Sequence, residues 1–195
     1  MTNPTEKIIR DYLERMVQIR STGGATSETS YYSAFENLLN EIGKTLKPAV
    51  VCNGQLRNQG AGHPDFGLYN KNQCAKGEPK QGQGEVPERG VIEVKPLSDN
   101  TWQTAKGKQA TKYFDHYRLV LVTNYRDFRL IGEGPTGKPV EREFYSLASD
   151  EMSFWAAAAH PVKTARDQGP TWLRCCAGLN RRFAKRVRMR SLVKT

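Results

Sequence analysis

The sequence predicts an α/β or α+β fold in which a central mixed β-sheet is flanked by helices. Two helical patterns occupy the first 43 residues, with Ile9, Leu13 and Met16 on one apolar face and Tyr32, Phe35, Leu39 and Ile42 on another. After them the apolar period becomes that of short strands. One further helical stretch then interrupts the strands, which favours a sheet with helices on its faces.

The first helix is expected from Pro4 to about Ile19, with Asn3 as its cap. The second is expected to stop at Gly43. Strands are expected in PAVVC, PDFGLY, GVIEVK, RLVLVT and DFRLIG, and a helix is expected over residues 102–117. The polar segment KNQCAKGEPKQGQGEVPER, between the second and third strands, is expected to be a long mobile loop.

Composition limits the possible functions. The chain has 195 residues, 37% hydrophobic and 26% charged, which suits one globular domain with a tail. It contains no apolar run of the ~20 residues that a membrane span needs, and residues 1–10 lack the apolar core of a signal peptide. We therefore expect a cytoplasmic protein without a membrane partner, with four reduced, structural cysteines in no metal-binding spacing.

The positive charge is concentrated near the C-terminus. Net charge is +10, and the run RRFAKRVRMRSLVK supplies seven basic and no acidic residues, leaving 10 − 7 = +3 for the others. This basic run is either a solvated end or a nucleic-acid contact, and the sequence alone favours neither. The candidate phosphate-binding residues in it are Arg181, Arg182, Lys185, Arg186, Arg188 and Arg190.

Charged residues interrupt two of the expected strands. Glu93 and Lys95 alternate with apolar residues, so both should point to one face of their strand. Asp65 follows Pro64 at the start of the preceding strand, and we expect the two carboxylates and the ammonium to converge at one sheet edge. Carboxylates suit Mg²⁺, which commonly takes one or two of them, and a lysine can stabilise developing negative charge. This set is typical of phosphodiester hydrolysis, although an isolated Glu-x-Lys is more often a surface ion pair.

Two further positions extend the candidate site. Gln109 and Tyr113 are four residues apart and therefore share a helix face that we expect to lie near Glu93 and Lys95. Glu36 lies beside the apolar stripe of the second helix, either as an ordinary boundary residue or as part of the site.

In order, Glu36, Pro64-Asp65, Glu93-Val94-Lys95 and Gln109-x-x-x-Tyr113 resemble the PD-(D/E)XK nuclease superfamily, which has the restriction-endonuclease-like fold. The surrounding text, from TGGATSETSYYSAFENLLNEIG to TNYRDFRLIGEG, is similar to the N-terminal nuclease domain of large restriction-modification enzymes that carry an adenine-N6 DNA methyltransferase. The resemblance covers roughly residues 5–147. The expected domains are accordingly a nuclease domain at 1–148 and, at 149–195, a helical and basic tail that is partly disordered or a truncated linker.

The resemblance implies a Mg²⁺-dependent DNA endonuclease, with Mn²⁺ as substitute and with methyltransferase and specificity modules as partners in the same or an associated chain. It implies metal ligation by Asp65 and Glu93 with Glu36 as an accessory acid, catalysis by Lys95, and a helix carrying Gln109 and Tyr113 that supports the site or touches DNA. Gly60 and Gly62 match a turn that approaches DNA closely. Two alternatives remain: a nuclease-like module that binds DNA without cutting, and a repair or structure-specific nuclease of the same superfamily.

Overall fold

The computed structural model describes residues 4–24, 28–54, 56–58, 60–74, 86–169 and 171. Their centre is one six-stranded mixed sheet, which confirms the predicted fold class. Strands β3 and β4 pair in parallel, and the other neighbouring pairs are antiparallel. In spatial order the strands are β1 (Val50–Gly54), β2 (Phe66–Asn70), β3 (Val91–Val94), β4 (Val120–Thr123), β5 (Asp127–Glu133) and β6 (Pro139–Ser146).

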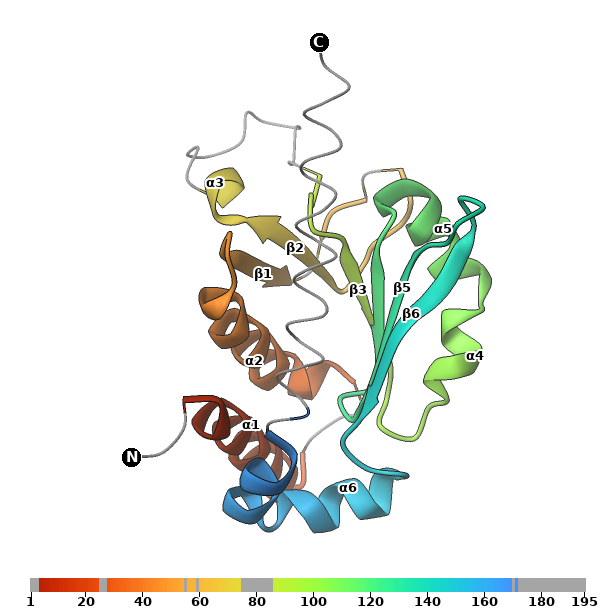
Figure 1. Cartoon of the computed structure of the whole chain (residues 1–195). Coiled ribbons are helices and arrows are strands. Elements are labelled where there is room, and N and C mark those ends of the chain that lie inside the picture. Colours follow the sequence, from red (N-terminus) through yellow and green to blue (C-terminus); the bar gives the residue numbers. More distant parts are fainter. Residues whose placement is uncertain are drawn as a thin grey trace.

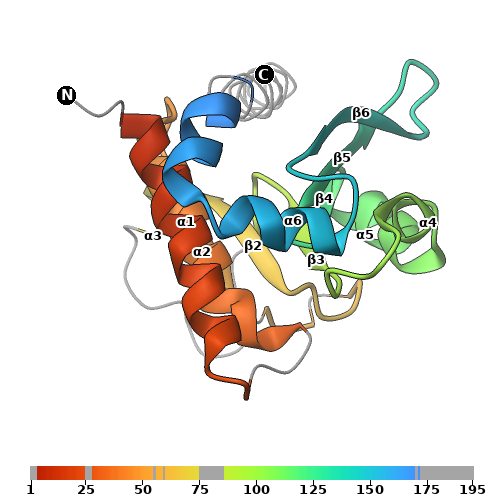
Figure 2. The same ribbon diagram turned by 90° about the horizontal axis from the view of Figure 1, so that it is seen from below.

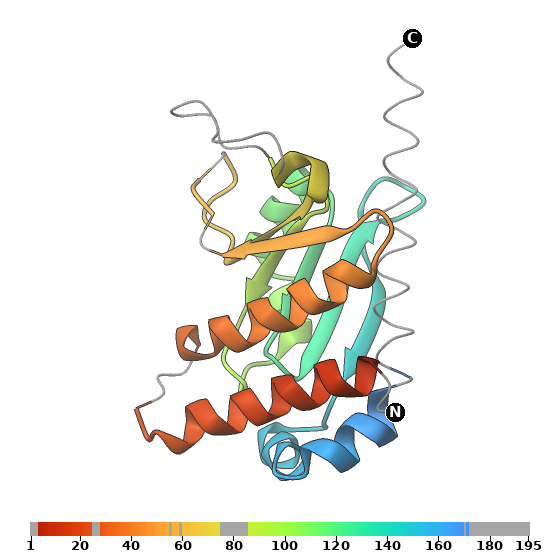
Figure 3. The same cartoon turned by 90° about the vertical axis from the view of Figure 1, so that its left-hand side faces the viewer.

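Helices cover both faces of this sheet (Figures 1 and 2). One side carries α1, α2 and α6, and α1 and α2 run side by side across the sheet in Figure 3. The other side carries α4 and α5. The helical elements are α1 (Pro4–Ser21), the short 3-10 helix η1 (Thr29–Tyr31), α2 (Tyr32–Thr45), α3 (Lys71–Cys74), α4 (Thr101–Ala105), α5 (Lys108–Tyr117) and α6 (Glu151–Ala158).

The alternation of side chains along β3 separates two hydrophobic cores. Ile92 and Val94 belong to the core shared with α1, α2 and α6, whereas Val91 belongs to the core shared with α5. Glu93 has the same parity as Val91. The strand pattern therefore places a carboxylate on the α5 face of a strand that is buried along its whole length.

Two helix boundaries differ from the sequence expectation. Gly43 lies inside α2, which continues to Thr45. A Cβ at Gly43 would be 2.1 Å from the carbonyl oxygen of Val50, so the glycine lets β1 approach the helix. The helix expected over residues 102–117 is two helices, because Gly107 has extended dihedrals and caps α5 after α4 has ended.

The structure also contains a strand that the sequence analysis did not predict, and it shows helices in the first part of the expected helical tail. Strand β6 pairs along β5, and its mostly exposed side chains explain why no apolar alternation marked it. Helix α6 buries Phe154 and Ala158 in the same core as α1. Residues 161–169 are also helical and add Ala165 to that core. The domain boundary at residue 148 stays a prediction, and the described helices beyond it pack on the sheet domain.

Several expectations concern residues outside the described ranges. Of the expected long loop, the first four residues form α3, and residues 75–85 lie outside the description, as does the basic run at 181–194. Asn3, Cys175 and Cys176 are outside it too. Cys52 is buried and Cys74 is exposed. Among the described helices, none is long and apolar enough to cross a membrane.

We predict that Gly43→Ala destabilises the fold by about 2 kcal/mol, because the new Cβ would overlap a backbone carbonyl that cannot move without displacing β1. Alanine's better helix propensity, worth about 1 kcal/mol, offsets only part of that cost. Urea denaturation measures the change. Gly24→Ala is the matched control, since a Cβ there meets only Thr22 Oγ1 at 4.0 Å. Equal stability of the two variants would contradict the close approach of β1 to α2.

Candidate active site

Asp65 joins the two sequence segments that carry the predicted site. It immediately precedes β2, and its backbone N–H donates to the carbonyl of Ile92 at 3.1 Å. Its carboxylate Oδ2 accepts a 2.7 Å hydrogen bond from the backbone N–H of Val94. Antiparallel pairing of β2 with β3 thus brings Asp65 beside the Glu93-Val94-Lys95 strand, as expected from the sequence.

Glu93 and Lys95 form an ion pair at the end of β3. Lys95 Nζ lies 2.7 Å from Glu93 Oε1, and the lysine side chain is 28% exposed whereas that of Glu93 is 3% exposed. The pKa of Glu93 is raised to about 7, chiefly by burial and also by the charge of Asp65, against the opposing hydrogen bond from Lys95. Burial alone would lower the pKa of Lys95, but the hydrogen bond and charge of Glu93 leave that pKa raised. Lys95 therefore stays positively charged beside Glu93, a carboxyl group whose pKa lies near neutral pH.

A third carboxylate, Glu28, approaches the same cluster and was missed in the sequence analysis. It lies just before η1, and Tyr32 Oη donates to both Asp65 Oδ1 at 2.5 Å and Glu28 Oε1 at 3.2 Å. Burial and then the charge of Asp65 raise the pKa of Glu28, while Lys95 and the Tyr32 hydrogen bond lower it. In the sequence, the signal for Glu28 and Tyr32 is that they are four residues apart at the start of a helical segment.

Glu36 meets the end of strand β1, which pairs with β2. Its Oε1 accepts a 3.2 Å hydrogen bond from the backbone N–H of Gly54, at the end of β1. The charges with the largest effect on Glu93 include those of Lys95, Asp65 and Glu28. The structure therefore connects Glu36 to strand β1, and its role as an accessory metal ligand stays a prediction.

Helix α5 places Tyr113 beside the turn that precedes Asp65. Gln109 Nε2 donates to Tyr113 Oη at 3.0 Å, and the charges of Glu93 and Asp65 contribute to a raised Tyr113 pKa, after burial as the main cause. Gly60 and Gly62 have φ of +101° and +111°, in the region that favours glycine. A Cβ at Gly62 would be 3.5 Å from the Tyr113 ring. The predicted helix face and glycine turn therefore meet.

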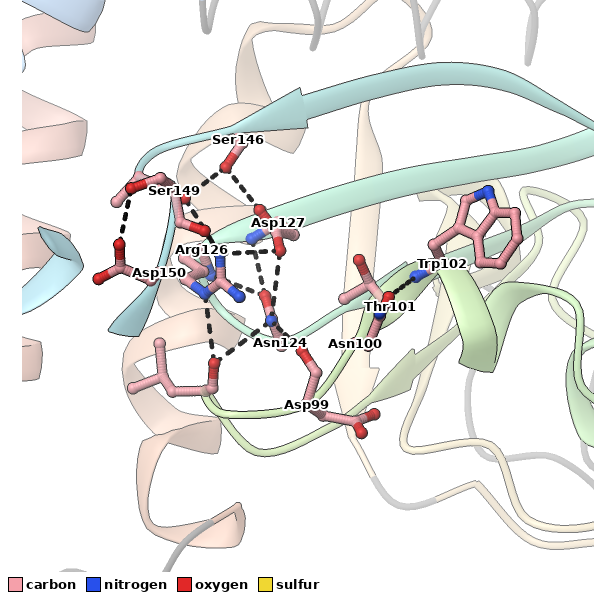
Figure 4. A network of polar contacts seen from close by, with 12 residues as sticks. Asp99, Asn100, Thr101, Trp102, Asn124, Arg126, Asp127, Ser146, Ser149 and Asp150 are labelled. Atoms are coloured by element: carbon pink, nitrogen blue, oxygen red, sulfur yellow. Dashed lines mark hydrogen bonds and ion pairs between the residues drawn. The ribbon is translucent and has the colours of Figure 1, made fainter. Parts of the chain in front are cut away.

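A buried polar network fixes the segment that follows Lys95 (Figure 4). Asn124, in the β4–β5 turn, donates to the carbonyl of Asp99 at 2.9 Å and accepts from the backbone N–H of Asp127 at 2.8 Å. Arg126 donates to the carbonyl of Leu97 at 3.2 Å and, at the β6–α6 corner, to that of Ser149 at 3.0 Å. The chain leaving β3 is thereby held to the β4–β5 turn.

The donor set suits a hard divalent cation. Within the described ranges, no group of three or more His, Cys, Asp or Glu side chains is assembled closely enough to form a ready metal cage. Mg²⁺ needs no such cage, because it keeps several waters and takes one or two carboxylates. Asp65 Oδ1 and Oδ2 each accept one hydrogen bond and retain a lone pair for a ligand. Asp65 and Glu93 therefore fit a Mg²⁺ site.

Comparison with solved structures finds a similarity to the cryo-EM structure of a DrdV–DNA complex, with a TM-score of 0.52 and 19% sequence identity. The match covers 85% of this chain and 14% of the DrdV chain, so this chain corresponds to a small part of that protein. At this identity the similarity shows the fold alone. No family model matches the sequence, and no curated protein does.

The raised pKa of Glu93 predicts how the stability of the metal-free protein depends on pH. The unfolded chain loses this proton near 4.5 and the folded chain near 7, so Glu93 lowers the free energy of unfolding as pH rises through that window. At about 1.4 kcal/mol for each pKa unit, the loss is about 3 kcal/mol. Urea denaturation in chelator should show Glu93→Gln gaining stability on wild type by up to that amount between pH 4.5 and 8. Parallel pH profiles of the two proteins would show that Glu93 is not buried as described.

Proposed function

We propose that this chain is a Mg²⁺-dependent DNA endonuclease, the cutting module of a restriction-modification system. The observation that supports this most directly is the convergence of Asp65, Glu93 and Lys95 at one sheet edge, in the order and spacing of the PD-(D/E)XK resemblance. A fold like that of a protein solved in complex with DNA agrees with this proposal.

In the proposed reaction Asp65 and Glu93 would hold the cation, which supplies Lewis-acid polarisation of the scissile phosphate and a more acidic bound water. Lys95 is a charged donor with its amine partly exposed, so it can orient the attacking water or stabilise charge on the phosphate oxygens. Glu93 must be ionised to bind the cation, and Lys95 favours that form. The Asn124 and Arg126 contacts hold the backbone that follows Lys95, and they thereby restrict where the Lys95 amine can lie.

The supporting residues would act on DNA or on the geometry of the site. Gln109 donates to the hydroxyl of the buried Tyr113, and the Gly60–Gly62 turn, whose two glycine N–H groups donate to Asn58 Oδ1, lies against the Tyr113 ring. Phosphate contact through this turn and the basic run carries no base information. We therefore propose that methyltransferase and specificity modules, in the same or an associated chain, select the sequence to be cut.

We predict that Asp65→Ala, Glu93→Ala and Lys95→Ala each reduce Mg²⁺-dependent cleavage of plasmid DNA by at least ~100-fold. Chelator should abolish the activity, Mn²⁺ should restore it, and Ca²⁺, which tolerates loose coordination, should not. Glu41→Ala is the matched control, because Glu41 is exposed on α2 and pairs with Lys44. DNA binding without any cleavage by the wild-type protein would instead favour the non-cutting module. Cleavage that survives in a folded Lys95→Ala protein would contradict the proposed chemistry.

We predict that wild type binds duplex DNA weakly and without sequence preference, with a dissociation constant of roughly 10⁻⁴ to 10⁻⁶ M near physiological salt. Deleting residues 181–195 removes seven basic residues and should flatten the dependence of affinity on salt, because fewer counterions are released. Fluorescence anisotropy over a salt series measures both slopes. An unchanged slope would mean that the basic run does not contact DNA, and discrimination of one short sequence would reveal a recognition element in this chain.

A further inference from the structure

Helix α4 carries an exposed tryptophan on the segment that follows Lys95. Trp102 is 49% exposed, whereas its neighbour Thr101 is buried. The Asn100 side chain accepts a 3.1 Å hydrogen bond from the backbone N–H of Trp102 and caps the helix (Figure 4). The chemistry proposed for the site makes no use of the Trp102 ring. Tryptophan joins a large apolar ring to a polar N–H group and is enriched where proteins meet partners, so Trp102 is a candidate ligand contact.

The register of the sheet places the start of α4 close to the proposed site. Thr101 Oγ1 accepts a 2.9 Å hydrogen bond from Arg129 Nε on β5. Arg129 is the register partner of Val122 on β4, and Val122 is the register partner of Glu93 on β3. Two strand spacings, or about 10 Å, therefore separate the backbone of Arg129 from that of Glu93. This distance corresponds to a few nucleotides along a DNA strand.

Lysines without acidic partners follow this tryptophan. Residues 102–112 contain Lys106, Lys108 and Lys112 and no acidic residue. All three lysines are exposed, and within the described ranges none of them forms an ion pair with a carboxylate. Lys106 Nζ lies 3.5 Å from the centroid of the Trp102 ring. This surface is therefore complementary in charge to a polyanion.

The lysines of α5 lie beside the helix face that is turned to the site. Lys108 and Lys112 are four residues apart and therefore share one exposed face of α5. Gln109 and Tyr113 each come one residue later, about 100° around the helix. Tyr113 is close enough to Glu93 for the charge of that carboxylate to contribute to its raised pKa. The positive face of α5 thus runs alongside the site.

An exposed indole among free lysines suits unpaired nucleotides better than a duplex. In a duplex each base is stacked on its neighbours, so a ring reaches a base face only after the step is unstacked. An unpaired base exposes its face, and aromatic rings next to positive charge are typical of surfaces that bind single strands. The contact of Lys106 with the Trp102 ring is weak at an exposed position, so this lysine can exchange the ring for a phosphate.

We propose that α4 and the start of α5 form a subsite for single-stranded DNA beside the proposed site. Trp102 stacks on an unpaired base, and Lys106, Lys108 and Lys112 contact the flanking phosphates. The inference rests on the proposed function in taking DNA as the ligand, and it deepens that function by naming a substrate with unpaired nucleotides near the phosphate that is cut. Binding at this subsite needs no divalent cation, so it can be tested apart from cleavage.

Fluorescence anisotropy of the full chain in chelator, with a labelled single-stranded oligonucleotide and with its duplex, tests the inference. Trp102→Leu removes the aromatic face and should weaken single-strand binding about tenfold while leaving duplex binding unchanged. Trp102→Phe is the matched control at the same position, because it keeps an aromatic face and should retain most of the single-strand affinity. Both variants should keep the thermal midpoint of wild type, since the side chain is half exposed.

A salt series measures the phosphate contacts. The double variant Lys108→Met/Lys112→Met should reduce the salt slope of single-strand binding by about 0.7 for each lysine, because fewer counterions are released. Lys138→Met is the matched control: Lys138 is exposed in the β5–β6 turn, at the opposite end of the sheet from Lys95. Its salt slope should equal that of wild type.

The outcomes separate this inference from the proposed function. Equal single-strand affinity of Trp102→Leu and wild type, or no single-strand binding by wild type, would overturn the stacking role. Equal losses of single-strand and duplex binding in Trp102→Leu would overturn the preference for unpaired nucleotides, and an unchanged salt slope in the double lysine variant would overturn the phosphate contacts. Absence of Mg²⁺-dependent cleavage, with the Trp102 effect on single-strand binding present, would instead refute the proposed nuclease and support the subsite.

Discussion

The carboxylate of Asp65 joins the two halves of the candidate site. One oxygen accepts from the backbone of Val94 and so fixes Asp65 against the strand of Glu93 and Lys95. The other accepts from the hydroxyl of Tyr32, the first residue of α2, which also donates to Glu28. The Asp65 side chain thus connects the Glu93–Lys95 ion pair at the end of β3 to Glu28 and Tyr32 at the start of α2.

The site is costly for the fold to maintain. Glu93 is a carboxylate on a strand buried along both faces, and burial works against its ionisation. Lys95 compensates in part, and two hydrophobic cores enclose the strand on which both residues lie. A carboxyl group whose pKa lies near neutral pH, next to a cation, is typical of functional sites. At such sites the fold gives up some stability so that the group can bind a ligand or transfer a proton.

Periodic signals in the sequence predicted much of the fold and the juxtaposition of Asp65, Glu93 and Lys95. Alternation along GVIEVK indicated that Glu93 and Lys95 share a face, and Pro64-Asp65 marked the start of the neighbouring strand. Glu28 has no such signal, because it lies in a turn before a helix, and its contacts depend on Tyr32 and on the distant Tyr125. Glu36 lies beside an apolar stripe, and this pattern does not reveal that its carboxylate meets strand β1. The same limit applies to Gly43, where a helix-stop residue serves a close approach to β1 that the local sequence does not reveal.

The central claim is that Asp65 and Glu93 hold one divalent cation. Crystals of the full chain soaked in Mn²⁺ test it most directly through the anomalous scattering of the metal. The account predicts one anomalous peak bonded to a carboxylate oxygen of each residue, with the Lys95 amine beside it. The absence of a peak between these two carboxylates, in crystals that hold Mn²⁺ elsewhere, would contradict it.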